Sequence, residues 1–375
     1  MLDRAEVEEI ASAEGKGHYF VSLYLNVDPL SNRGGDYAIH FKNMVKNTVD
    51  SLEKGLQKKI RGDIDRINHY VAANKGMFRK GLALLSSGEN AFWKVYHLGV
   101  PVKNEMAVST IPHIRPLIEV LDNYERYAVV LVEKKEARIF VIHLGEIVEY
   151  GEVKSPEVPG KHRQVGWYGL GETRFENHIN YHVRFHLKDV VEKLDSFLGG
   201  EHIGRLILGG SDEAVSAFRS LLHKTVLDRV IGTIRLEMFA PPDEVLRTTM
   251  QVISDYERKQ EAETVESLVT LSLKGKGAVL GLADVISALQ EQRVMKLVVV
   301  RDYKAAGYTC GACGFLSAEK AEPCPACDGD EKAKPVGDMV NLAAEMAVQQ
   351  GAAVEVVSDS VRLAEAGGIG AFLRF

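Results

Sequence analysis

Four cysteines constrain the local fold of this chain more strongly than any other feature of its sequence. Cys310, Cys313, Cys324 and Cys327 follow the pattern C-x2-C-x10-C-x2-C and are the only cysteines in 375 residues. Each C-x2-C pair lets one tight turn direct two thiolates toward a common centre, and two such turns complete a tetrahedron. The spacing therefore predicts a structural zinc ion with no open coordination position. Redox-active pairs or a chance cluster of buried thiols are the alternatives.

Length and composition indicate an ordinary multidomain protein. The 375 residues are enough for two or three domains, and 46% hydrophobic with 26% charged residues is typical of globular chains. A net charge of −6 argues against general nucleic-acid binding, so any RNA contact must come from local patches. The sequence has no apolar run long enough to span a bilayer, and its N-terminus is too acidic for a signal peptide. We expect a cytoplasmic protein without membrane contact.

The pattern of apolar residues predicts an α/β multidomain (α+β) fold with three domains. The first domain, 1–122, has a strand in HYFVSLYLNV, helical spacing from about Tyr37 to Asn74, and two further strands in KGLALLSS and AFWKVYHL. The middle domain, 123–241, opens with three strand-like runs separated by turns and continues with alternating helices and strands, including a strand near IRLEMF. The third domain, 242–375, is expected to be a small α/β/α sandwich with an inserted zinc ribbon at 308–330.

Residues 156–172 form a predicted exposed basic loop in the middle domain. Two prolines and several glycines favour a loop, and helical spacing begins at about Thr173. Cations in such a segment can neutralise phosphates, and flat rings can stack on exposed bases. A solvated surface loop followed by a core-facing helix is the alternative. The candidate RNA-binding residues are Lys161, His162, Arg163, Trp167, Tyr168, Arg174, His178, Tyr181, His182 and Arg184.

Three histidines share one face of the helix that is expected to follow this loop. His178, His182 and His186 follow one another at intervals of four residues. Such spacing can bind a metal ion, but the Glu that follows the first His in zinc metalloproteases is absent. Contact with RNA and a plain surface face are the other interpretations.

Residues 156–188 resemble the catalytic loop and following helix of the archaeal and eukaryotic class-one release factors and of Pelota. Pro159, Lys161 and His162 match the start of the loop, and His178, Asn180 and Tyr181 approximate the patch on the helix. The third domain resembles theirs in the stretch from Gly281 to Leu289 and in the ending Gly-Gly-Ile-Gly-Ala-Phe-Leu-Arg. Archaeal release factors also carry a zinc insertion in this domain, which agrees with the cysteine pattern. The resemblance covers roughly residues 123–375 and extends to the bacterial branch, which includes the hibernation factor Balon.

One departure from the family pattern bears on function. Where the release factors have Gly-Gly-Gln, this chain has Val165, Gly166 and Trp167, and Gln164 lies three residues before the Gln position. The tripeptide helps to position water at the ester of peptidyl-tRNA. Val165 restricts backbone freedom and Trp167 replaces an amide with a large ring. We therefore expect little or no hydrolysis of peptidyl-tRNA and designate no confident catalytic residue.

The resemblance implies a translation factor that binds the ribosomal A site near large-subunit rRNA, in ribosome rescue or hibernation. It also implies a translational GTPase partner of the elongation factor Tu type, and we expect a monomer when the protein is free. A peptide release factor with a variant loop and an RNA-binding or scaffold protein that does not act at the A site are the alternatives. The Asn-Ile-Lys-Ser motif with which eukaryotic release factors read stop codons is absent, so codon recognition is unsupported.

Overall fold

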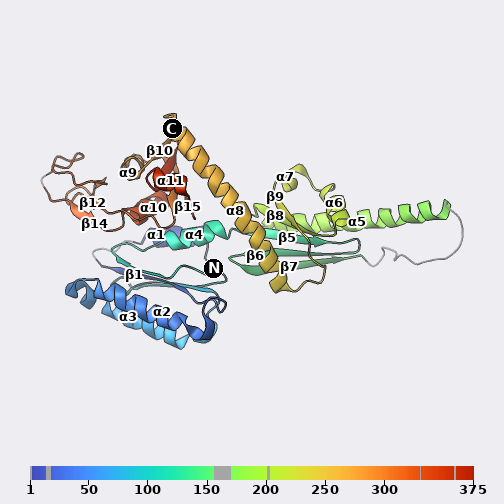
Figure 1. Cartoon of the computed structure of the whole chain (residues 1–375), viewed down its shortest axis with the longest axis horizontal. Coiled ribbons are helices and arrows are strands. Elements are labelled where there is room, and N and C mark those ends of the chain that lie inside the picture. Colours follow the sequence, from blue (N-terminus) through green and yellow to red (C-terminus); the bar gives the residue numbers. More distant parts are fainter. Residues whose placement is uncertain (1, 14–17, 156–169, 201–202, 330, 359) are drawn as a thin grey trace. The chain divides into compact units, whose positions relative to one another are not determined.

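The chain is described from a computed structural model, which covers residues 2–13, 18–155, 170–200, 203–329, 331–358 and 360–375 (Figure 1). It divides into two compact units. The first unit combines Met1–Asn123 with Arg258–Phe375, and the second is Tyr124–Glu257. The first predicted domain and residues 258–375 of the third therefore fall in one unit, while the division into three domains stays a prediction.

The N-terminal part of the first unit is an antiparallel sheet in the order β3-β2-β1-β4. Strands β1 and β2 are buried along almost their whole length, as expected for strands covered on both faces. Helices α2 and α3 cover one face, where Ile60 and Ile67 pack against Leu23 and Leu84 (Figure 1). The elements are α1 (Arg4–Ala11), β1 (Phe20–Asn26), α2 (Tyr37–Asp50), α3 (Lys54–Ala73), β2 (Gly81–Ser87), β3 (Phe92–Leu98), β4 (Glu105–Ser109) and α4 (Arg115–Asn123).

The C-terminal part of the first unit contains a mixed sheet in the order β10-β16-β11-β15. Strands β11 and β15 run parallel, and β16 runs antiparallel to β10 and β11. The last turns of α8 pack through Val265 and Leu268 against Val298 of β11. The elements are α8 (Pro242–Leu273), β10 (Ala278–Leu280), α9 (Leu282–Gln290), β11 (Val294–Val300), α10 (Met339–Gln349), β15 (Ala353–Val357), α11 (Val361–Glu365) and β16 (Ile369–Leu373).

A second, small sheet lies between β11 and α10 in the sequence, at the position where the insertion was predicted. It is antiparallel and has the order β13-β12-β14, with β12 at Gly307–Thr309, β13 at Leu316–Ser317 and β14 at Lys334–Val336. The third strand lies beyond residue 330, because β12 pairs with a segment that follows the last cysteine. We call residues 306–337 the cysteine-bearing insertion.

The second unit contains a five-stranded sheet in the order β7-β6-β5-β8-β9. Side chains of β5 alternate between two cores: Val130 faces α5 and α6, whereas Val129 faces the first turns of α8. The predicted three-stranded meander is present as β5, β6 and β7. The elements are β5 (Tyr127–Val132), β6 (Glu136–His143), β7 (Glu146–Lys154), α5 (Leu170–Gly200), β8 (Arg205–Gly210), α6 (Asp212–Arg219), α7 (Lys224–Leu227) and β9 (Val230–Ile234).

Two predicted boundaries were wrong. The last strand of the second unit is β9 at Val230–Ile234 and not the IRLEMF run, because β8 ends at Gly210 and offers no partner beyond Ile234. Helix α5 begins at Leu170, three residues before the predicted start. Strand β4 and helix α4 were not predicted at all. Among the described residues, none of the helices has a stretch long and apolar enough to cross a bilayer.

Glu345 in α10 gives a test of this packing. Its side chain is buried, Oε2 has no hydrogen-bond partner, and burial raises its pKa from the ordinary 4.5 to about 8. A raised carboxyl pKa means that the folded state keeps a proton that the unfolded state has lost, so stability falls as pH rises from 4.5 to 8. We expect Glu345→Gln to raise the free energy of unfolding at pH 8 by about 4 kcal/mol and to leave it nearly unchanged at pH 4.5.

Urea unfolding at the two pH values measures this difference. Glu365→Gln, at an exposed position in α11, is the matched control and should change neither value. Equal stability of wild type and Glu345→Gln at pH 8 would show that the carboxyl is not held neutral.

Candidate functional site

The four predicted cysteine ligands come together in the cysteine-bearing insertion. Their sulfur atoms all lie within 4.8 Å of one another. The Sγ atoms of Cys310 and Cys327 are 3.8 Å apart, and those of Cys313 and Cys324 are 3.7 Å apart. Among the described residues, this is the one group of three or more His, Cys, Asp and Glu side chains placed to hold a metal ion. The donor set of four thiols fits a soft, tetrahedral metal.

Backbone hydrogen bonds shape the two cysteine turns. In the first, the amide of Cys310 donates to Phe315 O at 2.8 Å, and that of Gly314 donates to Cys310 O at 3.1 Å, with a φ of 76° at Gly314. In the second, the amide of Asp328 donates to Cys324 O at 2.9 Å. The backbone N–H groups of Cys313 and Ala312 lower the pKa of Cys310, which favours the thiolate form that binds metals.

Gln290 attaches the insertion to the C-terminal sheet domain. Its side-chain amide accepts from Leu316 N at 2.8 Å and donates to Leu316 O at 3.1 Å, as a neighbouring strand would. Leu316 itself packs against Ile286 and Met339. The position of the cysteines relative to α9 and α10 is therefore fixed by an apolar contact and two hydrogen bonds.

Helix α5 has an inward and an outward face in its described half. Leu187, Val190 and Leu194 are buried in the core of the second unit. Tyr181 and Phe185 are 59% and 50% exposed, and their ring centroids lie 4.8 Å apart. Arg184 is exposed beside them, and Nζ of Lys188 lies 5.7 Å from the centre of the Phe185 ring. This surface, Tyr181, Arg184, Phe185 and Lys188, is called the α5 outer face below.

The predicted RNA-binding residues are only partly placed by the structure. Tyr181 and Arg184 lie on the α5 outer face, and His182 is half-buried next to Tyr181. Phe185 and Lys188 were not among the predicted contacts, although their spacing from Tyr181 and Arg184 by one helical turn would have indicated them. The variant loop, Gln164, Val165, Gly166 and Trp167, lies outside the described residues together with Lys161, His162, Arg163 and Tyr168, and so do the side chains of Arg174 and His178.

The interpretation of the histidines as one surface face was wrong for His186. This side chain is buried, its Nδ1 lies 3.0 Å from Ser155 Oγ, and burial lowers its pKa. Regular spacing identifies residues on one stripe of a helix, but it does not say whether the stripe borders the core. His186 lies next to buried Leu187, at the edge of the inward face.

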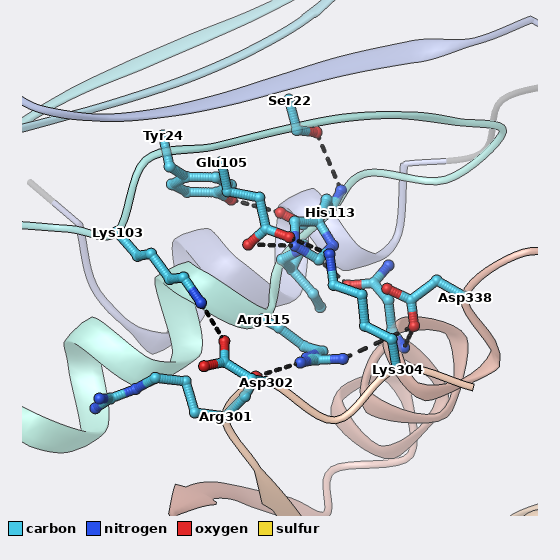
Figure 2. Close-up of polar contacts among 12 residues, drawn as sticks. Ser22, Tyr24, Lys103, Glu105, His113, Arg115, Arg301, Asp302, Lys304 and Asp338 are labelled. Carbon is cyan, nitrogen blue, oxygen red and sulfur yellow. Dashed lines mark hydrogen bonds and ion pairs between the residues drawn. The ribbon is translucent and has the colours of Figure 1, made fainter. Parts of the chain in front are cut away.

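A polar contact region between the N-terminal and C-terminal parts of the first unit was missed by the sequence analysis (Figure 2). Arg115 donates to the backbone carbonyls of Tyr303 at 2.8 Å and Arg301 at 2.6 Å, and its side chain is only 5% exposed. The side chain of Asn341 contacts the backbone of Pro112 and Ile114. A buried arginine requires partners, so Arg115 within the apolar run IPHIRPL was the available signal.

Charged side chains extend this contact region toward solvent. Glu105 of β4 lies 3.4 Å from His113 Nε2 and 2.5 Å from Lys304 Nζ (Figure 2). The close approach of His113 Nε2 and the positive charge of Lys304 hold the pKa of Glu105 well below its usual range. The His113 backbone is fixed in turn by Ser22 Oγ, which accepts from His113 N at 3.1 Å, and by Tyr24, whose hydroxyl donates to His113 O.

Comparison with known proteins gives matches over both units. The family model of bacterial archaeo-eukaryotic release factor family 10 matches residues 112–254. Peptide chain release factor subunit 1 of Methanocaldococcus jannaschii is 24% identical, and the match covers 100% of this chain and 97% of that protein. The same factor from Thermococcus onnurineus is 22% identical, with 99% and 97% covered.

Solved structures of the same group are similar to this chain only at low scores. Pelota of Archaeoglobus fulgidus matches with a TM-score of 0.37 and 16% identity, covering 79% of each chain. An archaeal translation termination factor matches with a TM-score of 0.26 and 15% identity, covering 100% of this chain and 98% of its own. Residues 112–254 thus match the bacterial family of archaeo-eukaryotic release factors, and the chain as a whole is similar in sequence to archaeal peptide chain release factors.

Proposed function

We propose that this protein binds the ribosomal A site, in rescue or hibernation, and hydrolyses peptidyl-tRNA weakly or not at all. The full-length match to archaeal peptide chain release factors supports an action on the ribosome. The observation that carries the second half of the proposal is the Val165-Gly166-Trp167 sequence at the position of Gly-Gly-Gln. A water molecule is activated only when its hydrogen-bond partners are placed accurately, and an indole ring does not replace a glutamine amide.

The α5 outer face supplies a surface of the right chemistry for ribosomal RNA. Arg184 and Lys188 bring positive charge, and Tyr181 and Phe185 offer rings on which unpaired bases can stack. From Asn180 to Lys188 the helix contains no acidic residue, although the chain as a whole is negative. Local charge of this kind favours phosphate binding without general affinity for nucleic acid.

A second candidate is peptide release with the variant loop. The similarity to archaeal proteins named peptide chain release factor subunit 1 favours it. Gln164 is the amide that could take the catalytic place. An RNA-binding or scaffold protein that does not act at the A site is the third candidate, and co-sedimentation with ribosomes separates it from the other two.

The remaining parts of the proposal concern partners and location. A translational GTPase of the elongation factor Tu type is the proposed partner, as the resemblance to the release factor and Pelota superfamily implies. We also propose a monomer in the free state and a cytoplasmic location, where ribosomes and reduced thiols are found together.

We propose that the four cysteines hold one structural zinc ion. Sulfur ligands about 2.3 Å from a tetrahedral zinc lie about 3.8 Å from one another, close to the two separations of 3.7 and 3.8 Å in the structure. Zinc would supply charge compensation for the thiolates and stability for the insertion. The ligands Cys310, Cys313, Cys324 and Cys327 leave it no free position for a substrate.

The zinc proposal predicts one zinc per chain in purified protein. Elemental mass spectrometry should show this ratio for wild type and for Ser317→Ala, a control in β13 that changes no ligand. Cys324→Ser should lose the metal under mild chelation that leaves wild type loaded, because one thiolate is missing. Protein folded at the insertion without any bound metal would contradict the proposal.

The α5 outer face predicts a specific loss of ribosome affinity. We expect the double variant Tyr181→Ala/Arg184→Ala to bind vacant ribosomes at least tenfold more weakly, since one stacked ring alone contributes about 1–3 kcal/mol. The slope of log affinity against log salt concentration should also become shallower by about one unit, because one phosphate contact is lost. Arg219→Ala removes an exposed cation from α6 of the same unit and is the control. Equal losses in both variants would point to general electrostatics.

The variant loop predicts the outcome of a peptide-release assay. Wild type should release little peptide from ribosomes carrying peptidyl-tRNA. The double substitution Val165→Gly/Trp167→Gln restores the family tripeptide and should raise the rate by about 10²-fold or more, the scale associated with one well-placed hydrogen-bond donor. Gln164→Ala should leave the wild-type rate unchanged. Rapid release by wild type that Gln164→Ala abolishes would establish the second candidate.

A further inference from the structure

The cysteine-bearing insertion joins the rest of the first unit through two neighbouring segments. Residues 301–305 lead from β11 into it, and residues 338–341 lead out of it into α10. The amide of Met339 donates to Ala305 O at 2.8 Å, so the two segments are hydrogen-bonded to each other. A group that contacts both segments therefore helps to fix the position of the insertion on the rest of the unit.

Arg115 contacts the incoming segment from the N-terminal part of the unit. Its Nη2 and Nη1 donate to the carbonyls of Arg301 at 2.6 Å and Tyr303 at 2.8 Å (Figure 2). A planar guanidinium can bind two carbonyls of alternate residues at once, which an ammonium group cannot do with the same geometry. The nearly complete burial of Arg115 makes these bonds costly to lose.

Asn341 contacts the same N-terminal segment from the outgoing side. Its Oδ1 accepts from Ile114 N at 3.2 Å and its Nδ2 donates to Pro112 O at 3.1 Å. Asp338 connects the two sets of contacts, because its Oδ1 accepts from Asn341 N at 3.0 Å and lies 3.8 Å from Arg115 Nη1. Residues 112–115 therefore bind the insertion at both of its ends.

The contacts continue from these ends toward the cysteines. A Cβ atom at Gly307 would lie 2.4 Å from Met339 Cε, so β12 packs directly on the first side chain of α10. Met339 also packs against Leu316, one residue after Phe315, whose carbonyl accepts from Cys310. A continuous series of packed and hydrogen-bonded groups runs from Cys310 to Arg115 and Asn341.

We propose that metal binding at the four cysteines and anchoring of the N-terminal part on the C-terminal part are coupled through Arg115 and Asn341. Both act as positioning residues, since neither lies among the sulfur ligands. The bound metal orders the insertion and its two ends, and the ordered ends bind residues 112–115. By linkage, loss of the anchoring contacts must weaken metal binding by the same factor.

Hydrogen exchange of wild-type protein, loaded with zinc or stripped by a chelator, measures the first half of the coupling. Stripping should speed amide exchange at least several-fold in peptides covering residues 112–119, although these residues are about 200 positions from the cysteines in sequence. Strand β2 at Gly81–Ser87 should exchange at the same rate in both states. Unchanged exchange at 112–119 in protein whose metal content has fallen to zero would overturn the coupling.

Metal competition with a chromophoric chelator measures the second half. Asn341→Ala and Arg115→Lys should each weaken zinc binding about fivefold or more, the usual lower range of coupling between two sites. Lys103→Ala is the control, because it removes the exposed ion pair between Lys103 and Asp302 at the same contact region. Zinc affinities equal to that of wild type in both variants would overturn the proposal.

The two experiments distinguish a failure of the coupling from a failure of zinc binding. The exchange experiment needs no substitution, so it decides the question even where a variant fails to fold by circular dichroism. Absence of bound metal from purified wild type would overturn both the zinc proposal and the coupling. Bound zinc without a metal-dependent change at residues 112–119 would overturn the coupling alone, and neither result bears on ribosome binding.

Discussion

The pair of hydrogen bonds from Arg115 to two backbone carbonyls is the interaction on which the architecture of the first unit depends. The unit is assembled from the two ends of the chain, with Tyr124–Glu257 between them, so no short connection holds its halves together. A buried guanidinium is unfavourable without hydrogen-bond acceptors, and here the carbonyls that accept from Nη1 and Nη2 of Arg115 come from the other half. Asn341 adds a reciprocal contact in the opposite direction. This interface forms only when both parts are correctly folded, because Arg115 and Asn341 each find their backbone hydrogen-bond partners in the other part.

Much of the fold followed from periodic patterns within short segments. Strands β1, β2 and β5 were predicted because their apolar runs are continuous, and α3 because its apolar residues recur at helical spacing. Strand β4 and helix α4 were not predicted, because EMAVS is short and α4 begins with a buried arginine whose partners lie 186 and 188 residues away. The end of β9 is likewise set by where β8 stops and not by its own composition.

The candidate sites also differ in how much of their signal is local in the sequence. The cysteines were predicted correctly as a group because all four ligands lie within 18 residues and their spacing alone defines two turns. Tyr181 and Arg184, predicted as RNA contacts, share the exposed α5 outer face with Phe185 and Lys188, which were not among the predicted contacts, and contact with RNA there stays a prediction. His186 was assigned to the wrong environment, because four-residue spacing does not determine how a helix is rotated against the sheet. The contacts of Arg115 depend on tertiary structure and carry almost no local signal.

The hydrogen bond between Met339 and Ala305 has an evolutionary consequence. Since the two ends of the cysteine-bearing insertion are direct neighbours, the chain could bypass residues 306–337 with a short turn and keep the order of β11, α10 and β15 intact. The fold therefore permits the insertion to be gained or lost as one segment, without a change in the order of the surrounding strands and helices.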